Sequence, residues 1–322
     1  MLDSLLSLLR CVQADCEARL EVRRAGTTRQ DELWHGLLGC RRCEAVYPVL
    51  AGVPIMVGEP PHWLSAYRDA ALATLAQHGE ADRTAVALVQ ALADAYGRTE
   101  PERFDDDWTD NDLETSWPLP PSAATFGGHA FRTFLGEAEK RRPEDLLATW
   151  AGAARSGKRR TKPTWVLDLG CGVGVTARAL AGVAKRVIVS DQSLRAVMSA
   201  RRAAQSLDAE VHPLVVDAHH LPLRRKCLDV IVAAQLIDLL DDPRGMLQGA
   251  HRSLKQRGAL LLSTPAPEIL DEDGPLTAWL TMEGFEIERR DTIPWVRAHD
   301  ARHFQVYFPE SLLCRKLREA KA

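Results

Sequence analysis

The fold of this chain is decided by the stretch WVLDLGCGVGVTARAL, residues 165–180. The apolar residues before Gly170 predict a buried strand, the alternating glycines predict a tight turn, and residues 176–180 predict a helix. A strand that passes through a glycine-rich turn into a helix N-terminus is typical of an α/β fold that binds a ligand at the turn.

The spacing within this turn discriminates between classes of ligand. A dinucleotide-binding fingerprint reads G-x-G-x-x-G, whereas Gly170, Gly172 and Gly174 form G-x-G-x-G. Asp168 stands two residues before the first glycine, where its carboxylate would repel a pyrophosphate and attract a positively charged amino group. We therefore expect a ligand such as the methionine end of S-adenosylmethionine.

Acidic residues end the next two predicted strands. The strands expected over 186–190 and 211–216 lead into Asp191 and into Asp217 with Ala218. An acid at the end of the second strand can accept hydrogen bonds from both ribose hydroxyls. The rest of the series consists of strands expected over 228–233 and 258–263, a helix through 243–254, and an antiparallel pair formed by 284–287 and 303–307.

Through these motifs, residues 163–317 resemble the class I, Rossmann-like, S-adenosylmethionine-dependent methyltransferases. The resemblance implies an α/β fold with a seven-stranded methyltransferase sheet flanked by helices, and S-adenosylmethionine as the cofactor. The glycine motif would then cradle the methionine portion, and the acids after the second and third strands would receive the ribose and the adenine. The cofactor-binding residues implied in this way are Asp168, Gly170, Gly172, Gly174, Asp191, Asp217, Ala218, Ala234 and Gln235.

The sequence contains fewer motifs that identify the methyl acceptor. Residues 233–238 read AAQLID, which lacks both the N/D-P-P-Y stretch of enzymes that methylate adenine or glutamine amino groups and the Pro-Cys of cytosine-C5 enzymes. Direct in-line transfer to an O, N or C acceptor remains, and it needs mainly positioning with at most one general base. Gln235 and Asp238 are the nearest polar candidates, and the sequence assigns no catalytic residue.

Four of the seven cysteines lie near the N-terminus, as the pairs Cys11 with Cys16 and Cys40 with Cys43. Four thiolates in two close pairs are a ligand set that zinc binds tetrahedrally. Short strands are expected near residues 20–22 and 33–34, and a hairpin turn is expected at Ala51-Gly52. A segment this small has little core of its own, which favours a bound metal.

Residues 38–57, with the pattern L-x-C-x-x-C-x-x-x-Y-P-V-x-x-G-V-P-I-M, resemble the Trm112-like zinc-ribbon family. The departure is the first cysteine pair, because the family usually has C-P-x-C where this chain has C-V-Q-A-D-C over 11–16. In that family the ribbon is a partner that docks on methyltransferases and activates them. The resemblance therefore implies Zn²⁺ held by Cys11, Cys16, Cys40 and Cys43.

The chain divides into three predicted segments: a Trm112-like zinc ribbon over 1–59, a helical lid or linker over 60–162, and the S-adenosylmethionine-binding methyltransferase domain over 163–322. Within the middle segment we expect two helices over 62–97, broken near Gly79.

The remainder of the middle segment contains two charged stretches. The acidic residues around 105–114 lie near Trp108 and Trp117, and they form either a lid over the acceptor or a solvated connector. A helix is expected to run up to about Trp150. The basic residues of 155–162 form either a phosphate contact or a solvated linker.

Composition limits the classes of function. The chain of 322 residues has 41 Lys and Arg against 44 Asp and Glu, a net charge of −3, so nucleic-acid binding would need a local basic patch. The absence of a long apolar run or a secretory pattern predicts a cytoplasmic protein with reduced thiols and no membrane partner. Cys171, Cys227 and Cys314 are then expected to be unpaired.

Three hypotheses for function remain open at this point. The first is a methyltransferase for a small molecule, with the middle segment as a lid. The second is a methyltransferase acting on tRNA, rRNA or a translation protein, in which the ribbon replaces in cis a subunit that others recruit in trans. The third is a non-enzymatic interaction module that binds the cofactor. The ribbon favours the second hypothesis, whereas the acidic stretch and the lack of a basic stripe favour the first.

Overall fold

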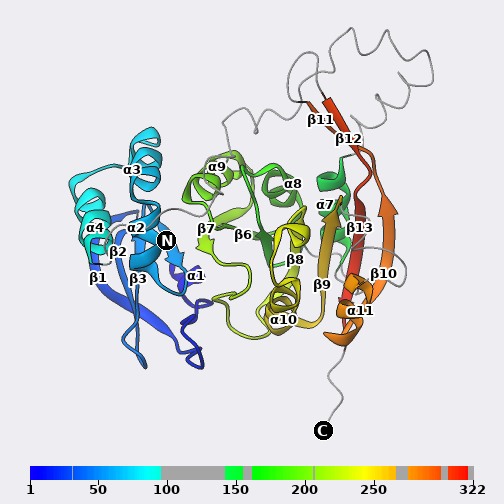
Figure 1. Cartoon of the computed structure of the whole chain (residues 1–322), viewed down its shortest axis with the longest axis horizontal. Helices are drawn as coiled ribbons and strands as arrows, with labels where there is room; N and C mark the ends of the chain where they lie inside the picture. The colour runs from blue at the N-terminus through cyan, green and yellow to red at the C-terminus, as the bar shows by residue number, and fades with distance from the viewer. Residues whose placement is uncertain are drawn as a thin grey trace.

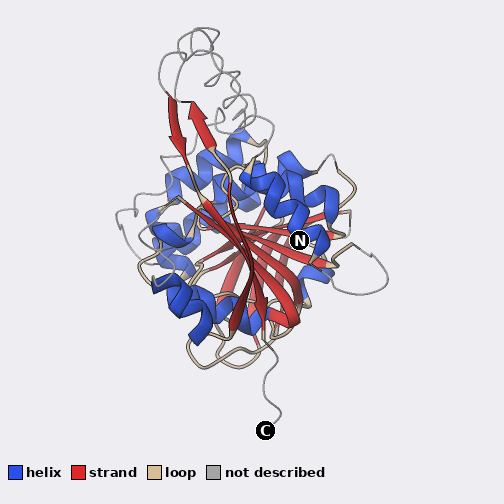
Figure 2. Ribbon diagram, turned by 90° about the vertical axis from the view of Figure 1, so that its right-hand side faces the viewer, coloured by secondary structure: helices blue, strands red, loops and turns tan. Residues whose placement is uncertain are grey.

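The computed structural model describes residues 1–30, 32–95, 142–154, 162–205, 207–265, 275–298 and 304–317. One eleven-stranded sheet runs through this part of the chain in the order β1-β2-β3-β4-β7-β6-β5-β8-β9-β13-β10 (Figure 1). Helices lie on both sides of the twisted strands (Figure 2). The expected segments 98–124 and 125–141, the basic residues 155–161 and the lid hypothesis lie outside the described residues.

The strands of the large sheet come from both ends of the chain. In chain order they are β1 (Leu20–Arg29), β2 (Glu32–Cys40), β3 (Val46–Leu50), β4 (Val53–Met56), β5 (Trp165–Leu169), β6 (Arg186–Asp191), β7 (Glu210–Val216), β8 (Leu228–Ala234), β9 (Leu254–Thr264), β10 (Phe285–Thr292) and β13 (Glu310–Lys316). A separate two-stranded sheet consists of β11 (Trp295–Ala298) and β12 (Phe304–Tyr307).

The described helices divide between the two faces of the sheet. Apolar residues of α1 (Asp3–Leu6), α10 (Pro243–Ser253) and α11 (Pro275–Met282) belong to the core of one face. The helices whose apolar residues belong to the core of the other face are α2 (Pro60–Ala66), α3 (Arg68–Gln77), α4 (Arg83–Asp94), α7 (Pro143–Ala153), α8 (Val175–Val183) and α9 (Leu194–Ala204). A short 3₁₀ helix, η2 (Ile237–Leu239), follows β8.

Seven strands of the large sheet, β5 to β10 and β13, lie after residue 162. Strands β7, β6, β5, β8 and β9 pair in parallel, and β13 pairs antiparallel with both β9 and β10. Parallel strands in this arrangement bring their carboxyl ends to one edge, where ligands of α/β sheets bind. The predicted strands over 186–190, 211–216, 228–233 and 258–263 are confirmed to within a few residues.

The prediction of a separate seven-stranded sheet is wrong, because the sheet continues past β7. Strand β4 pairs in parallel with β7, with Ile55 opposite Val215 and Met56 opposite Val216. All four residues of β4 are buried, as is typical of a strand inside a parallel sheet. The N-terminal strands therefore continue the C-terminal sheet, which gives eleven strands.

The expected pairing of 284–287 with 303–307 is also wrong. Strand β10 pairs with β13, whereas β12 pairs with β11. The apolar run Leu312–Cys314 within β13 is buried. Burial of these side chains between β9 and β10 stabilises the sheet more than pairing β10 with the half-exposed residues 305–307 would, although those residues are closer to β10 in the chain.

The N-terminal strands are longer than the sequence predicts, but their turn is as expected. Ala51 and Gly52 have φ values of 50° and 77°, the positive values that a two-residue hairpin turn requires. The helical break near Gly79 is confirmed, and three helices rather than two occupy residues 60–94. No helix among the described residues is long and apolar enough to cross a membrane.

Candidate functional site

The glycine-rich loop after β5 turns back over the end of β6. The backbone N–H groups of Gly170 and Cys171 both donate to the Ser190 carbonyl at 2.9 Å. Gly174 has a φ of 100°, and a Cβ there would lie 2.5 Å from the Cα of Ala200. Only glycine fits this close approach of the loop to α9, so the turn that leads into α8 depends on it.

Asp168 lies under this loop as a buried carboxylate. Its side chain is 1% exposed, and neither of its oxygens has a hydrogen-bond partner among the described residues. Burial, followed by the charges of Asp191 and Glu144, raises the pKa of its carboxyl to about 8. A buried carboxylate without a partner is costly, so the arrangement favours a cationic group at this position.

Asp191 connects the end of β6 with the glycine loop. Its Oδ2 accepts a hydrogen bond from the Gly172 N–H at 3.0 Å, and its Oδ1 accepts one from the Ser193 N–H at 3.0 Å. The carboxylate therefore holds the loop and the start of α9 together, and it lies in the position from which an acid can reach a ribose.

Asp217 follows β7 and is contacted by two histidines. Its Oδ1 lies 2.7 Å from Nδ1 of His219, and its Oδ2 lies 3.2 Å from Nδ1 of His220. Although burial raises the pKa of the Asp217 carboxyl, hydrogen bonds from the His219 N–H and from both rings lower it below its ordinary value. Asp217 is therefore ionised and ready to accept further hydrogen bonds.

The residues after β8 complete the same edge of the sheet. Gln235 has a φ of 53°, and its N–H donates to the Ser263 carbonyl at 2.6 Å. Asp238 accepts a hydrogen bond from the Thr264 hydroxyl at 3.0 Å, so β9 holds this carboxylate. Ala234 is half-buried and packs on the core formed with α7 and α8.

The predicted cofactor residues thus gather where β5, β6, β7 and β8 end, and one further acid joins them. Glu144, in the first turn of α7, is only 9% exposed. Burial raises the pKa of its carboxyl, and its charge acts on Asp168. Glu144 could not be selected from the sequence, because it belongs to no motif and resembles any acid in the first turn of a helix.

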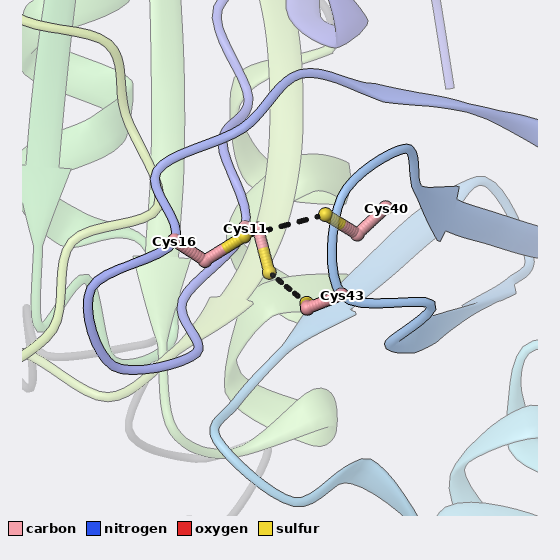
Figure 3. A group of neighbouring side chains, drawn as sticks. All are labelled: Cys11, Cys16, Cys40 and Cys43. Carbon is pink, nitrogen blue, oxygen red and sulfur yellow. Dashed lines mark hydrogen bonds between the residues drawn. The ribbon is translucent and has the colours of Figure 1, made fainter.

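A second candidate site is the cysteine cluster of the N-terminal strands (Figure 3). The sulfur atoms of Cys11, Cys16, Cys40 and Cys43 all lie within 4.8 Å of one another. Cys11 lies 3.4 Å from Cys43, and Cys16 lies 3.5 Å from Cys40. A zinc ion with Zn–S bonds of about 2.3 Å needs sulfur atoms about 3.8 Å apart, so the cluster fits the ion despite its wider first pair.

Backbone groups favour the thiolate form at one residue of this cluster, Cys40, whereas burial raises the pKa of Cys11 to about 12. The Arg42 N–H donates to the Cys40 sulfur at 3.3 Å. Although burial raises the pKa of Cys40, hydrogen bonds from the backbone of Cys43 and Arg42 and from neighbouring thiols lower it to about 7. The Tyr47 hydroxyl lies 3.0 Å from the Cys11 sulfur. Metal ligands must be deprotonated, and these contacts favour that state at Cys40.

The other three cysteines are free and buried, as the sequence predicts. Cys171 is 6% exposed, and burial, with the charges of Asp191 and Asp168, raises its pKa well above its ordinary value. A thiol in this state is not a nucleophile, so Cys171 fills space inside the loop.

Comparisons with known proteins agree with this geometry. Residues 167–262 match the family model described as a methyltransferase domain. The chain is 32% identical over 113 residues to the malonyl-[acyl-carrier protein] O-methyltransferase of Hamiltonella defensa, which covers 34% of this chain and 42% of that protein. It is 27% identical over 105 residues to the ubiquinone biosynthesis O-methyltransferase of Glaesserella parasuis, which covers 31% of this chain and 44% of that protein.

Among solved structures, the N-methyltransferase NodS of Bradyrhizobium japonicum is 18% identical, with a TM-score of 0.43 over 56% of this chain and 97% of that one. The chain spans less than half the length of the two named relatives. Residues 167–262 match a methyltransferase domain, and they lie in a mixed sheet flanked by helices.

Proposed function

We propose that this protein is an S-adenosylmethionine-dependent methyltransferase that binds its cofactor across the ends of β5, β6, β7 and β8. The observation that carries the proposal is the buried Asp168 carboxylate, which has no partner among the described residues and lies beside the charges of Asp191 and Glu144. S-adenosylmethionine bears an ammonium and a sulfonium group and supplies an electrophilic methyl group when bound. The unpartnered Asp168 carboxylate suits such a ligand, because a nearby positive charge favours its ionised form.

Each residue of this edge has a role in the proposal. Asp168 accepts hydrogen bonds from the amino group, and the glycine loop allows the backbone to approach the methionine portion. Asp191 accepts from the ribose hydroxyls, and Asp217 with Ala218 receives the adenine amino group. Ala234 and Gln235 form the wall beside the transferred methyl group.

Binding is tested by calorimetry with S-adenosylmethionine on the wild type and two variants. Asp168→Asn keeps the shape of the side chain but removes the charge, and we expect it to weaken binding roughly 10- to 100-fold. Asp69→Asn, at an exposed position of α3, removes the same charge far from the motif and should bind like the wild type. Equal affinities for all three proteins would contradict the assignment.

For the acceptor, we infer an oxygen atom of a small or carrier-bound molecule. Two of the relatives are named as O-methyltransferases for a malonyl-carrier substrate and for ubiquinone biosynthesis, which supports this class. Transfer to oxygen needs alignment and at most one base. Gln235 in that wall and Asp238 three residues later are the polar side chains that would orient the acceptor.

A second candidate acceptor is an RNA or a translation protein. The observation that favours it is the parallel pairing of β4 with β7, which joins the strands of the cysteine cluster to the cofactor-binding sheet. In this proposal the N-terminal segment is a zinc ribbon that acts as a built-in activating subunit. The fit of the four sulfur atoms to a tetrahedral ion supports Zn²⁺ there.

The two acceptors are separated by incubating labelled S-adenosylmethionine with fractionated cell extract. Label in the small-molecule or carrier-protein fraction supports the first acceptor, and label in RNA or ribosomal protein supports the second. Tight cofactor binding without label in any fraction would contradict both and favour a cofactor-binding interaction module. The Asp168→Asn variant is the control, because it should transfer little label into any fraction.

A further inference from the structure

A charged cavity lies on the described molecule outside the cofactor-binding edge and the cysteine cluster. Its volume is about 530 Å³, and its lining includes Arg10, Arg19 and Arg224. These residues come from the segment after α1, from the residue before β1, and from the loop between β7 and β8. No motif recognised in the sequence contains any of them, so their convergence is visible only in three dimensions.

Backbone pairing places the three side chains together. Leu9 and Leu223 form an antiparallel bridge, and both side chains are buried, at 0% and 2% exposed. Because side chains alternate along paired segments, the neighbouring Arg10 and Arg224 point away from this buried pair. Hydrogen bonds from the Arg10 N–H to the Pro222 carbonyl and from the Arg224 N–H to the Leu8 carbonyl, both 2.8 Å, fix the register.

Arg19 completes the group from the other side. It forms an antiparallel bridge with Arg10, so two guanidinium groups leave the backbone from directly opposite positions. Like charges in such a cross-strand pair repel each other.

The described residues compensate little of this positive charge. Within the described part of the chain, neither Arg19 nor Arg224 has a hydrogen bond or ion pair from its guanidinium group, and Asp3 is the acidic residue of the lining. The nearby Glu17 carboxylate binds Arg252 at 2.8 Å and Arg225 at 3.5 Å. The Arg10 guanidinium donates to the Ser7 and Leu9 carbonyls, at 3.3 Å and 2.6 Å, and these carbonyls are uncharged. Three guanidinium groups therefore share a cavity with one carboxylate.

We propose that this cavity binds an organic phosphomonoester, with the phosphate on Arg10, Arg19 and Arg224. Guanidinium groups match phosphate oxygens in geometry and charge. Leu6 and Leu20 supply an apolar wall for the organic part. The volume lies within the range of about 300–1,000 Å³ that small-molecule sites occupy, and is larger than a bare inorganic anion requires. The net charge of −3 does not oppose a local site of this kind.

Calorimetry with phenyl phosphate tests the proposal, because this probe lacks the adenine and ribose that the cofactor-binding edge would recognise. We expect saturable binding to the wild type, and a loss of about tenfold or more in affinity in Arg19→Gln and in Arg224→Gln. Arg83→Gln is the matched control, since Arg83 is exposed at the start of α4; it should bind like the wild type. Phenol, which lacks the phosphate, should not bind.

Arg19 and Arg224 are both exposed, so the variants should fold, and an unchanged melting temperature without ligand verifies this. Equal binding of phenyl phosphate by all four proteins, or no binding by the wild type, would overturn the proposal. A short single-stranded RNA serves as a third probe. RNA binding that is lost in Arg19→Gln while phenyl phosphate fails to bind would also overturn it, in favour of a polymer backbone.

Discussion

The two candidate sites of this molecule are built in opposite ways. The cofactor-binding edge takes its residues from the ends of adjacent strands in the middle of the sheet, and its buried Asp168 carboxylate has no hydrogen-bond partner within the described chain. The cysteine cluster takes its residues from two loops near the edge of the sheet. The first site is shaped by a core that exists without the ligand, whereas the second brings together thiols that a metal would hold. The first site should therefore cost stability until its ligand binds, whereas the second should depend on its metal for stability.

The largest expected effect is removal of the metal. Cys40→Ser should abolish stoichiometric zinc and lower the free energy of unfolding by several kcal/mol, because a structural zinc site contributes directly to folding. Atomic emission gives the metal content, and urea unfolding gives the stability. Cys227→Ala, a buried thiol outside the cluster, is the control and should retain one zinc per chain. Equal zinc contents in the two variants would show that Cys40 does not bind zinc and would contradict the proposed metal site.

The next effect is a dependence of stability on pH caused by Asp168. Its folded pKa of about 8 lies above the unfolded value of about 3.9, so the folded state keeps a proton that the unfolded state releases. Its contribution is therefore fully present below about pH 4 and is lost as pH rises toward 8. Asp168→Asn should stabilise the ligand-free protein at pH 8, by at most roughly 5 kcal/mol.

Chemical unfolding at pH 5 and pH 8 measures this effect. The wild type should lose more stability than Asp168→Asn between the two values, and Asp69→Asn should follow the wild type. If the variant were as sensitive to pH as the wild type, Asp168 would not carry the uncompensated charge.

A third effect separates the shape of the loop from its charge. Gly174→Ala places a Cβ 2.5 Å from the Ala200 Cα at a φ of 100°, so we expect a loss of about 1–3 kcal/mol and weaker cofactor binding. Gly182→Ala, in the same helix with no atom within 4 Å of its Cβ, should gain up to about 1 kcal/mol. Thermal unfolding compares the two, and similar losses in both would mean that the loop tolerates side chains.

The smallest effect concerns Glu144. Glu144→Gln removes one of the charges that raise the pKa of Asp168, so that pKa should fall toward its ordinary value. Cofactor affinity should fall by less than about tenfold, because the charge acts through Asp168. Asp145→Asn, at the exposed neighbouring position, is the control. A pH dependence of binding identical to the wild type would place Glu144 outside the site.

The sequence predicts the residues that form contiguous motifs, and it fails where contacts are distant. Asp168 and the three glycines could be predicted to lie together because strand, turn and helix follow one another within a few residues. The pairing of β4 with β7 joins residues about 160 positions apart. The local sequence of Val53–Met56 does not identify the strand with which it pairs. Glu144 and the three arginines of the cavity were missed for the same reason, since only the packing of separate segments brings them to a site.

The cysteine cluster could be predicted from the sequence only in part. Its four residues could be chosen because close pairs of cysteines are a local signal, yet their approach to within 4.8 Å depends on β1, β2 and the loop over 11–16. Spacing alone left the wider first pair in question. The structure shows that the two additional residues of C-x4-C still allow both sulfur atoms to face the second pair.

The central claim is that the buried Asp168 marks the place of a cationic cofactor, and proton release on binding tests it most directly. Calorimetry of S-adenosylmethionine binding at pH 7, in buffers of different ionisation enthalpy, counts the protons exchanged. A carboxyl with a pKa of about 8 is mostly protonated at this pH and must ionise beside an ammonium group, so the wild type should release close to one proton and Asp168→Asn none. Binding without proton release, or the same release in both proteins, would contradict the account.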